Sequence, residues 1–309
     1  MNSKLQLIRV TEFITSFDNR EMNHIMRMIE VDKIMEIIEQ TKASAHETAK
    51  AQARDMVMQG TLWEWVGPRQ LDAWSKAVDC YREAIKIDEQ SGDAHYQLAH
   101  CYALGLGSRR DWESAIQEFI LAAELGNKDA LNDLAVFYAT GQHVEQSTDK
   151  AIELLERAHG KDDEYAAEAW FNHGLLCEQL GKNGEAEVKY MKSSLWQAQN
   201  NLAICNYEQG STDPEEVQLL LEGACDKCGN DPRPWYNLAL ITNNAQQKRV
   251  YWINAADRGY DKACVRIARC YLDGDRIEKN RDKAIHYYTI AANQGNRTAI
   301  NALRTLRVR

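Results

Sequence analysis

Cys225 and Cys228 form a Cys-x-x-Cys motif, a spacing that is typical of redox and metal chemistry. In thioredoxin-type sites such a pair lies at the N-terminus of a helix, where the positive end of the helix dipole lowers the thiol pKa. In a structural zinc site the pair supplies two of about four ligands. The chemistry that is available therefore depends on the element that carries the two sulfurs.

Other catalytic motifs are incomplete. His46 and Glu47 begin a stretch like the zinc-protease motif His-Glu-x-x-His, but Lys50 stands where the second histidine should be. Gly105 and Gly107 form an isolated Gly-x-Gly without the lysine of a phosphate-binding loop. The chain also lacks a Gly-x-Ser-x-Gly nucleophile elbow. The sequence therefore predicts no enzyme activity, no cofactor and no metal.

The bulk composition indicates a folded protein that does not bind nucleic acid or membranes. The chain of 309 residues has 44% hydrophobic residues, four prolines and a net charge of -9. A binder of phosphate backbones needs a surplus of Lys and Arg, whereas this acidic balance favours basic partners. Because the sequence contains no signal-like or membrane-spanning apolar run, we expect a cytoplasmic protein whose eight cysteines are reduced.

A short unit, Ala-x-x-x-Leu-Ala and its variants, recurs along the chain. Its copies begin at residues 94, 130, 169, 198, 234, 263 and 299. A second unit, Ala-x-x-x-aromatic-x-x-small, lies between them, for example at Ala77 to Ala84 and Ala284 to Ala291. Spacings of four and seven residues place these side chains on one helical stripe. Each period is therefore predicted to be a helix–turn–helix hairpin.

The best-preserved copy runs from Ala268 to Gly295. A Tyr and a Gly end its first helix, Asp-Lys-Ala begins its second helix, and Ala-Ala-x-x-Gly ends it. The Tyr, Gly and Asp-Lys-Ala elements recur between Tyr138 and Ala151. This pattern resembles the Sel1-like repeat family, which is related to tetratricopeptide repeats, and it covers the chain from about residue 70 onward.

The resemblance implies an all-α fold, a right-handed α-solenoid or superhelix of about six to seven stacked hairpins with an N-terminal helical cap. We expect residues 1–46 to form this capping segment and residues 47–309 to form the solenoid. Apolar residues at helical spacing between Met22 and Glu39 support a helix there, and a Met-rich segment that fills the groove or a helix that docks on a partner is the alternative. The hairpin that begins at Pro234 is predicted to be short, because only 14 residues separate its two anchors, against 21 in three other copies.

The repeat register also answers the cysteine question. Cys225 and Cys228 follow the second-helix unit, so they are predicted to lie at the C-terminal end of a helix, where the dipole raises a thiol pKa. Cys101, Cys205 and Cys270 occupy a column that elsewhere holds Phe, Leu and Ile. We interpret the cysteines as packing residues. A redox pair, or a metal site with Cys264 as a third ligand, is the alternative for the Cys-x-x-Cys motif.

A binding surface is predicted on the concave side of the solenoid, which first helices line in proteins of this kind. Amide side chains in one column, flanked by aromatic residues, suit a bound peptide backbone. The alternative is that these amides are bonded to the neighbouring helix. The predicted binding residues are Tyr96, Gln97, His100, Asp133, Phe171, Asn172, Asn201, Tyr236, Asn237, Arg266 and Arg269.

The function that the resemblance implies is a non-catalytic adaptor or scaffold, expected in a bacterium, that binds a protein or peptide. One alternative is an immunity or inhibitor protein whose acidic groove covers a basic toxin or effector. Another is a thiol-dependent or β-lactamase-like enzyme, because some cysteine-rich relatives are described in those terms. The oligomeric state and the identity of the partner stay open.

Overall fold

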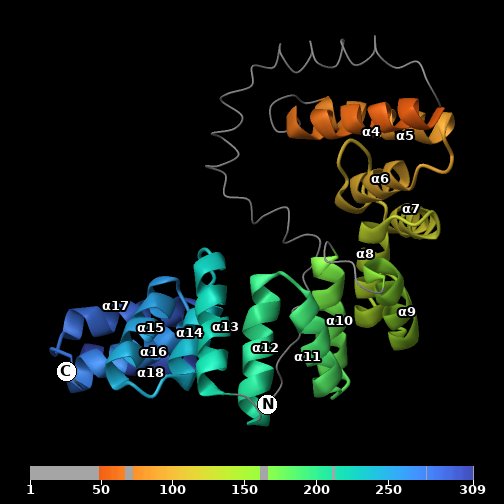
Figure 1. The fold of residues 1–309 in the computed structure, drawn as a ribbon. Coiled ribbons are helices and arrows are strands. Elements are labelled where there is room, and N and C mark those ends of the chain that lie inside the picture. Colours follow the sequence, from red (N-terminus) through yellow and green to blue (C-terminus); the bar gives the residue numbers. More distant parts are fainter. Residues whose placement is uncertain (1–48, 67–71, 161–165, 211–212, 276, 309) are drawn as a thin grey trace. The chain divides into compact units, whose positions relative to one another are not determined.

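The computed structural model describes residues 49–66, 72–160, 166–210, 213–275 and 277–308. Its regular structure in these ranges is entirely helical, with fifteen helices labelled α4 to α18 in Figure 1. The predicted all-α class is therefore confirmed. None of the helices in these ranges has the length and apolarity that a membrane span requires. The predicted cap at residues 1–46, its boundary with the solenoid and the helix at 22–39 lie outside the described residues.

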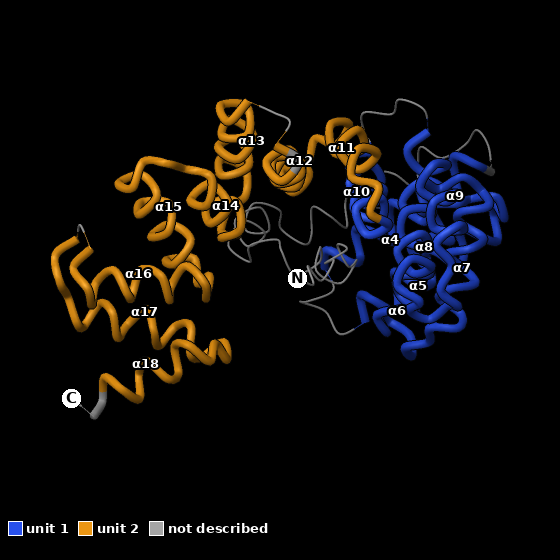
Figure 2. Tube along the Cα trace, turned by 90° about the horizontal axis from the view of Figure 1, so that it is seen from below, with its two compact units in different colours: residues 1–180 blue, residues 181–309 orange. Residues whose placement is uncertain are grey.

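The chain divides into two compact units, residues 1–180 and 181–309 (Figure 2). The described helices of unit 1 are α4 (Ala49–Val66), α5 (Ala73–Ile87), α6 (Gly92–Leu104), α7 (Trp112–Glu124), α8 (Lys128–Thr140), α9 (Thr148–His159) and α10 (Ala167–Gln179). Those of unit 2 are α11 (Asn183–Lys192), α12 (Trp196–Gln209), α13 (Pro214–Lys227), α14 (Arg233–Ile241), α15 (Ala245–Asp257), α16 (Asp261–Asp273), α17 (Arg281–Asn293) and α18 (Arg297–Val308).

Consecutive helices pack as hairpins within each unit. In unit 1 the pairs are α4–α5, α6–α7 and α8–α9, and α10 packs on α8 and α9. In unit 2 the pairs are α12–α13, α14–α15 and α16–α17, with α11 on α12 and α18 on α17. Each hairpin contacts its neighbours in sequence, which is the arrangement of a helical repeat solenoid.

Helix α4 precedes the stretch from about residue 70 in which the repeat pattern is recognisable, and it falls inside the expected solenoid range 47–309. Helix α4 packs along α5, and the ring of Tyr81 leaves no room for a Cβ atom at Gly60. The Tyr81 hydroxyl donates a hydrogen bond to Glu64 Oε1 at 2.9 Å. Because α4 has glycine where a ring inserts and lacks the Ala-x-x-x-Leu-Ala unit, sequence comparison with the later copies did not identify it.

Local signals fix the ends of the hairpin helices. The side chains of Asp111, Ser147 and Asn280 accept hydrogen bonds from backbone N–H groups in the first turns of α7, α9 and α17. The preceding first helices α6 and α8 end at Gly105 and Gly141, with φ of 71° and 69°. Glycine adopts this left-handed conformation without steric cost, so the chain leaves each helix at a defined residue.

The predicted second-helix stripe forms the core between helices. Ala77, Ala115, Ala151 and Ala284 are fully buried. The large residues of the stripe are buried as well, with exposed fractions of 3% or less at Tyr81, Phe119, Leu155 and Tyr288. The predicted short hairpin is also confirmed, because α14 has 9 residues whereas the first helices α6, α8 and α16 have 13.

Candidate functional site

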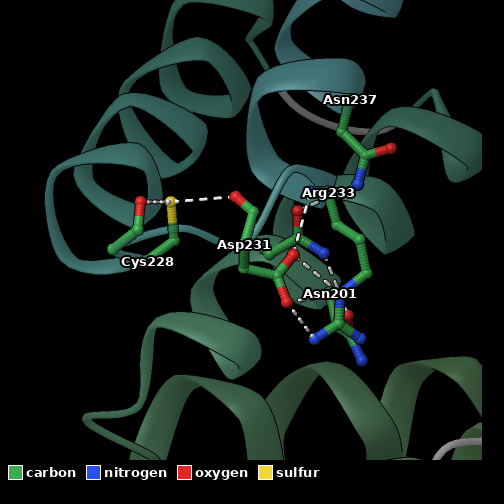
Figure 3. Close-up of polar contacts among 7 residues, drawn as sticks. Asn201, Cys228, Asp231, Arg233 and Asn237 are labelled. Atoms are coloured by element: carbon green, nitrogen blue, oxygen red, sulfur yellow. Dashed lines mark hydrogen bonds and ion pairs between the residues drawn. The ribbon is translucent and has the colours of Figure 1, made fainter. Parts of the chain in front are cut away.

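The Cys-x-x-Cys motif lies at the C-terminal end of α13, as predicted. Cys225 is in the last turn and Cys228 caps the helix (Figure 3). The Cys228 thiol donates to the backbone oxygens of Cys225 and Asp231, both at 3.3 Å. Burial raises the pKa of Cys225 to about 12 and also raises the pKa of Cys228. Both sulfurs are buried protonated thiols near neutral pH, which is the state of a packing residue and not of a nucleophile.

The structure gives Cys264 no role as a third ligand. Its thiol is fully buried and donates to the backbone oxygen of Ala256 at 3.4 Å. Across the described ranges, no three His, Cys, Asp or Glu side chains are grouped so that they could hold a metal ion.

In unit 2 the predicted amide column is engaged inside the protein. Asn237 donates its side-chain amide to Asn200 Oδ1 at 2.9 Å (Figure 3), and Asn200 donates to Asn201 Oδ1 at 3.2 Å. Asn201 in turn donates to the Tyr190 hydroxyl at 3.3 Å. These bonds join α14, α12 and α11, so the amides align neighbouring helices.

The same use of amides occurs in unit 1. Asn172 on α10 donates to Asn132 Oδ1 on α8 at 2.9 Å, and its exposed fraction is only 2%. Phe171 is buried at 3%. Asn172 and Asn237 thus each donate a side-chain hydrogen bond to the neighbouring first helix.

The remaining predicted residues of unit 2 lie nearer the surface. Arg266 is exposed, and its guanidinium lies 5.4 Å from the centre of the Trp252 ring. Arg269, also exposed, interacts with the Tyr288 hydroxyl. The ring of Tyr236 packs 4.7 Å from that of Tyr260. This surface of unit 2 is thus aromatic and basic.

In unit 1 the predicted residues Tyr96, His100 and Asp133 come together. The Tyr96 hydroxyl donates to Asp133 Oδ2 at 3.2 Å, and His100 Nε2 lies 3.5 Å from the same oxygen. The rings of Tyr96 and His100 meet edge to face at 4.5 Å. Gln97, on the same helix, is partly exposed. Asp133 itself is buried at 6%.

Two acidic residues that sequence reasoning missed, Asp129 and Glu168, lie near this group, and a third, Asp93, lies near Asp129. Desolvation raises the pKa of Asp129, although its side chain reaches solvent, and the carboxylates of Asp133 and Asp93 raise it further. Desolvation likewise raises the pKa of Glu168, and Asp133 and Asp129 add to that shift. We name this surface the acidic face of unit 1, and it consists of Asp93, Tyr96, Asp129, Asp133, His100 and Glu168.

A regular sequence signal marks these acids. Asp93, Asp129 and Glu168 each stand one residue before a first-helix anchor alanine, in the first turn of α6, α8 and α10. Acidic residues there also stabilise the helix dipole, which would lower their pKa values. Because the pKa values of Asp129 and Glu168 are raised, desolvation and mutual repulsion outweigh the dipole at these two positions.

A family model of the Sel1 repeat matches residues 92–127, 128–158, 196–216 and 261–296. Among solved structures, the chain is similar to a Sel1 repeat protein from Oxalobacter formigenes, with a TM-score of 0.65 and 18% identity over 92% of this chain and 83% of that one. It is also similar to pilF of Pseudomonas aeruginosa, with a TM-score of 0.52 and 18% identity over 69% of this chain and 91% of that one.

At these identities the structural likeness concerns the fold alone. Repeat proteins of this type generally mediate protein–protein interactions and are typically non-catalytic. Four matched repeats, the hairpin packing of both units and the similarity to solved repeat proteins agree with one another. Four segments of the chain are therefore Sel1 repeats, as the sequence pattern predicted.

Proposed function

We propose that this protein is a non-catalytic adaptor that binds a polypeptide on the acidic face of unit 1. The observation that carries the proposal is the clustering of Asp129, Asp133 and Glu168 beside Tyr96 and His100, with pKa values of Asp129 and Glu168 raised. The fold supports it because repeat solenoids of this type commonly bind partners along their first helices.

The charge of the face defines the chemistry of the partner. Carboxylates that repel one another are costly to maintain in the free protein, and a Lys or Arg side chain placed among them would relieve that repulsion. Tyr side chains are enriched among the residues that dominate interface energies, and Tyr96 is held in place by its bond to Asp133. The partner segment is therefore expected to be basic.

The amide column is left out of the proposed contact surface. Asn172, Asn201 and Asn237 are committed to bonds within the protein. Arg266 and Arg269 are accessible, but they would repel the same basic segment. Of the residues expected from sequence, Tyr96, Gln97, His100 and Asp133 fit the proposed site.

Site-specific crosslinking tests the proposal. A photoreactive p-benzoylphenylalanine in place of the partly exposed Gln97 should capture a polypeptide from native cell extract. The same group in place of Gln117, which is exposed on the second helix α7, is the matched control and should not capture it. Circular dichroism checks that both variants are folded.

A charge variant then identifies the determinant. Asp129→Asn with Glu168→Gln should weaken crosslinking at residue 97 roughly tenfold, since two charge pairs together contribute about 1–2 kcal/mol. Glu124→Gln with Glu153→Gln removes two charges from exposed second-helix positions and should leave it unchanged. Equal capture from positions 97 and 117, or no effect of the first charge variant, would rule out the acidic face as the binding surface.

A further inference from the structure

A cavity of about 230 Å³ lies beside the acidic face in unit 1. Helices α6, α7 and α8 form its walls, together with the two loops that follow α6 and α8. His100 lines the cavity and also belongs to the acidic face, so the two features adjoin. Engineered apolar cavities of about 150 Å³ already bind benzene, so this volume is sufficient for an aromatic ring.

Aromatic rings line much of the cavity. Phe119 packs against His100 at 5.1 Å and against Phe137 at 5.6 Å, and Phe137 meets Trp112 at 6.0 Å. These ring pairs are all edge-to-face. Such an arrangement presents both ring faces and ring edges to the interior, and a guest ring can pair favourably with either.

The loop after α8 holds a histidine in a backbone conformation that usually requires glycine. His143 has a φ of 62°, and in the described part of the chain it is the sole non-glycine residue with positive φ. In the loop after α6 the corresponding position is Gly107, with a φ of 66°. The His143 ring stacks on Trp112 at 3.7 Å, so this conformation delivers a ring to the rim of the cavity.

The rim also carries an unpaired positive charge. Arg110 lines the cavity, lies 5.4 Å over the Trp112 ring and forms no ion pair with any acidic side chain in the described ranges. Desolvation and the neighbouring Arg110 lower the pKa of His143, so this imidazole is neutral near neutral pH. Among the residues that the structure describes, no acidic side chain lines the cavity.

We infer that this cavity is a socket for an aromatic side chain of the bound polypeptide, with a carboxylate of the same polypeptide held at Arg110. This inference rests on the proposed function for its occupant, because the ring and the carboxylate belong to the adaptor's partner. It adds a specificity element that the acidic face lacks: the face selects basic residues, whereas the socket selects an aromatic residue next to an acidic group.

Small probes test the socket without the acidic face. N-acetylphenylalanine carries a ring and a terminal carboxylate, acetyl-Phe-Glu-amide carries a ring and an acidic side chain, and N-acetylphenylalanine amide carries the ring alone. Each is titrated into full-length protein in which histidine is isotopically labelled. We expect the imidazole signals of His100 and His143 to shift, while those of the buried His159 and His173 stay unchanged.

The two probes with a carboxylate should bind about fivefold more tightly than the amide, as one partly exposed ion pair allows. Whichever of the two binds more tightly identifies the carboxylate as a chain terminus or an acidic side chain. Arg110→Gln should abolish the preference, and Arg109→Gln, at the adjacent exposed arginine that does not line the cavity, should retain it. Ala103→Leu places extra carbon atoms in the cavity and should abolish binding of all three probes.

Equal binding of the amide and the carboxylate probes would overturn the role of Arg110. Absence of any shift at His100 and His143 would overturn the socket itself. Neither result affects the crosslinking test at Gln97, because that test depends on the charges of Asp129 and Glu168 and not on the cavity. The proposed function and this inference therefore fail separately.

Discussion

The first helices of the two units share one repeat register, but the same position in that register is acidic in unit 1 and basic or neutral in unit 2. One residue before the anchor, unit 1 has Asp93, Asp129 and Glu168, whereas the same column in unit 2 holds Gln197, Arg233, Lys262 and Thr298. Over the whole sequence, residues 1–180 contain 18 Lys and Arg against 31 Asp and Glu, and residues 181–309 contain 19 against 15. The repeat specifies where a surface side chain is presented, but not which chemistry it presents.

The two units also differ in the interactions of the charged residues that precede the anchors. In unit 2, Arg233 stands one residue before the anchor Pro234 and forms an ion pair with Asp231 at 2.7 Å (Figure 3). In unit 1 desolvation raises the pKa values of Asp129 and Glu168, and the carboxylate of Asp133 adds to both shifts. The charge of Arg233 is thus neutralised within unit 2, whereas neighbouring carboxylates raise the cost of the charges on Asp129 and Glu168 in unit 1.

The largest expected effect tests whether the two units, which have the same kind of helical framework, unfold independently of each other. Phe119→Ala in unit 1 and Leu221→Ala in unit 2 each remove a buried side chain, and we expect losses of about 3–5 and 2–5 kcal/mol respectively. Hydrogen exchange followed by mass spectrometry should show faster exchange confined to the mutated unit. Equal acceleration in both units would mean that the units unfold together.

A smaller effect, on the free energy of unfolding, distinguishes amides that stabilise the fold from residues that bind a partner. Asn172→Ala leaves Asn132 without its donor in a buried place, and we expect a loss of about 1–3 kcal/mol in stability. Asn237→Ala, at the matched position in unit 2, should cost less because its bond is only partly buried. Denaturant titration of each variant provides the comparison. An unchanged stability of Asn172→Ala, with loss of partner capture, would return this column to the binding surface.

The smallest effect concerns the acidic face alone. Asp129→Asn should stabilise the protein at pH 7 by less than about 1 kcal/mol, because it removes a charge that is desolvated and repelled by Asp133 and Asp93, on a side chain that still reaches solvent. A raised pKa in the folded state means that the cost of ionisation appears as pH rises through that pKa, so the gain should vanish as pH falls toward the ordinary pKa of aspartate.

Lys262→Gln is the matched control for this prediction, because it occupies the same column in unit 2. Thermal unfolding of both variants is measured between acidic and neutral pH. A stabilisation by Asp129→Asn that persists at low pH would show that electrostatic repulsion is not its source.

Most of the framework could be predicted from sequence because it depends on spacing. Small and large residues at intervals of four and seven must share a helical stripe, and Ala115 and Phe119 are indeed buried together. The position of Cys225 and Cys228 followed from the same register. The repeat pattern itself could not be traced into helix α4, because its contact with α5 depends on Gly60, a residue that has no side chain to form a pattern.

The candidate site was less predictable because it depends on contacts between repeats. Whether Asn172 faces a partner or Asn132 is decided by the orientation of α10 on α8, which no spacing specifies. The raised pKa values of Asp129 and Glu168 arise from burial and from carboxylates on neighbouring helices, and the cavity depends on rings from three helices. Such properties become visible only when the hairpins are packed together.

The hairpin packing has a consequence for synthesis of the chain. The bond between Asn172 and Asn132 spans 40 residues, and that between Asn237 and Asn200 spans 37, so partners across neighbouring first helices are about one repeat apart. A contact order this local favours rapid folding, and a chain leaves the ribosome at about 5–20 residues per second. Each hairpin can thus dock on the preceding one within seconds of its translation, before the next hairpin has emerged.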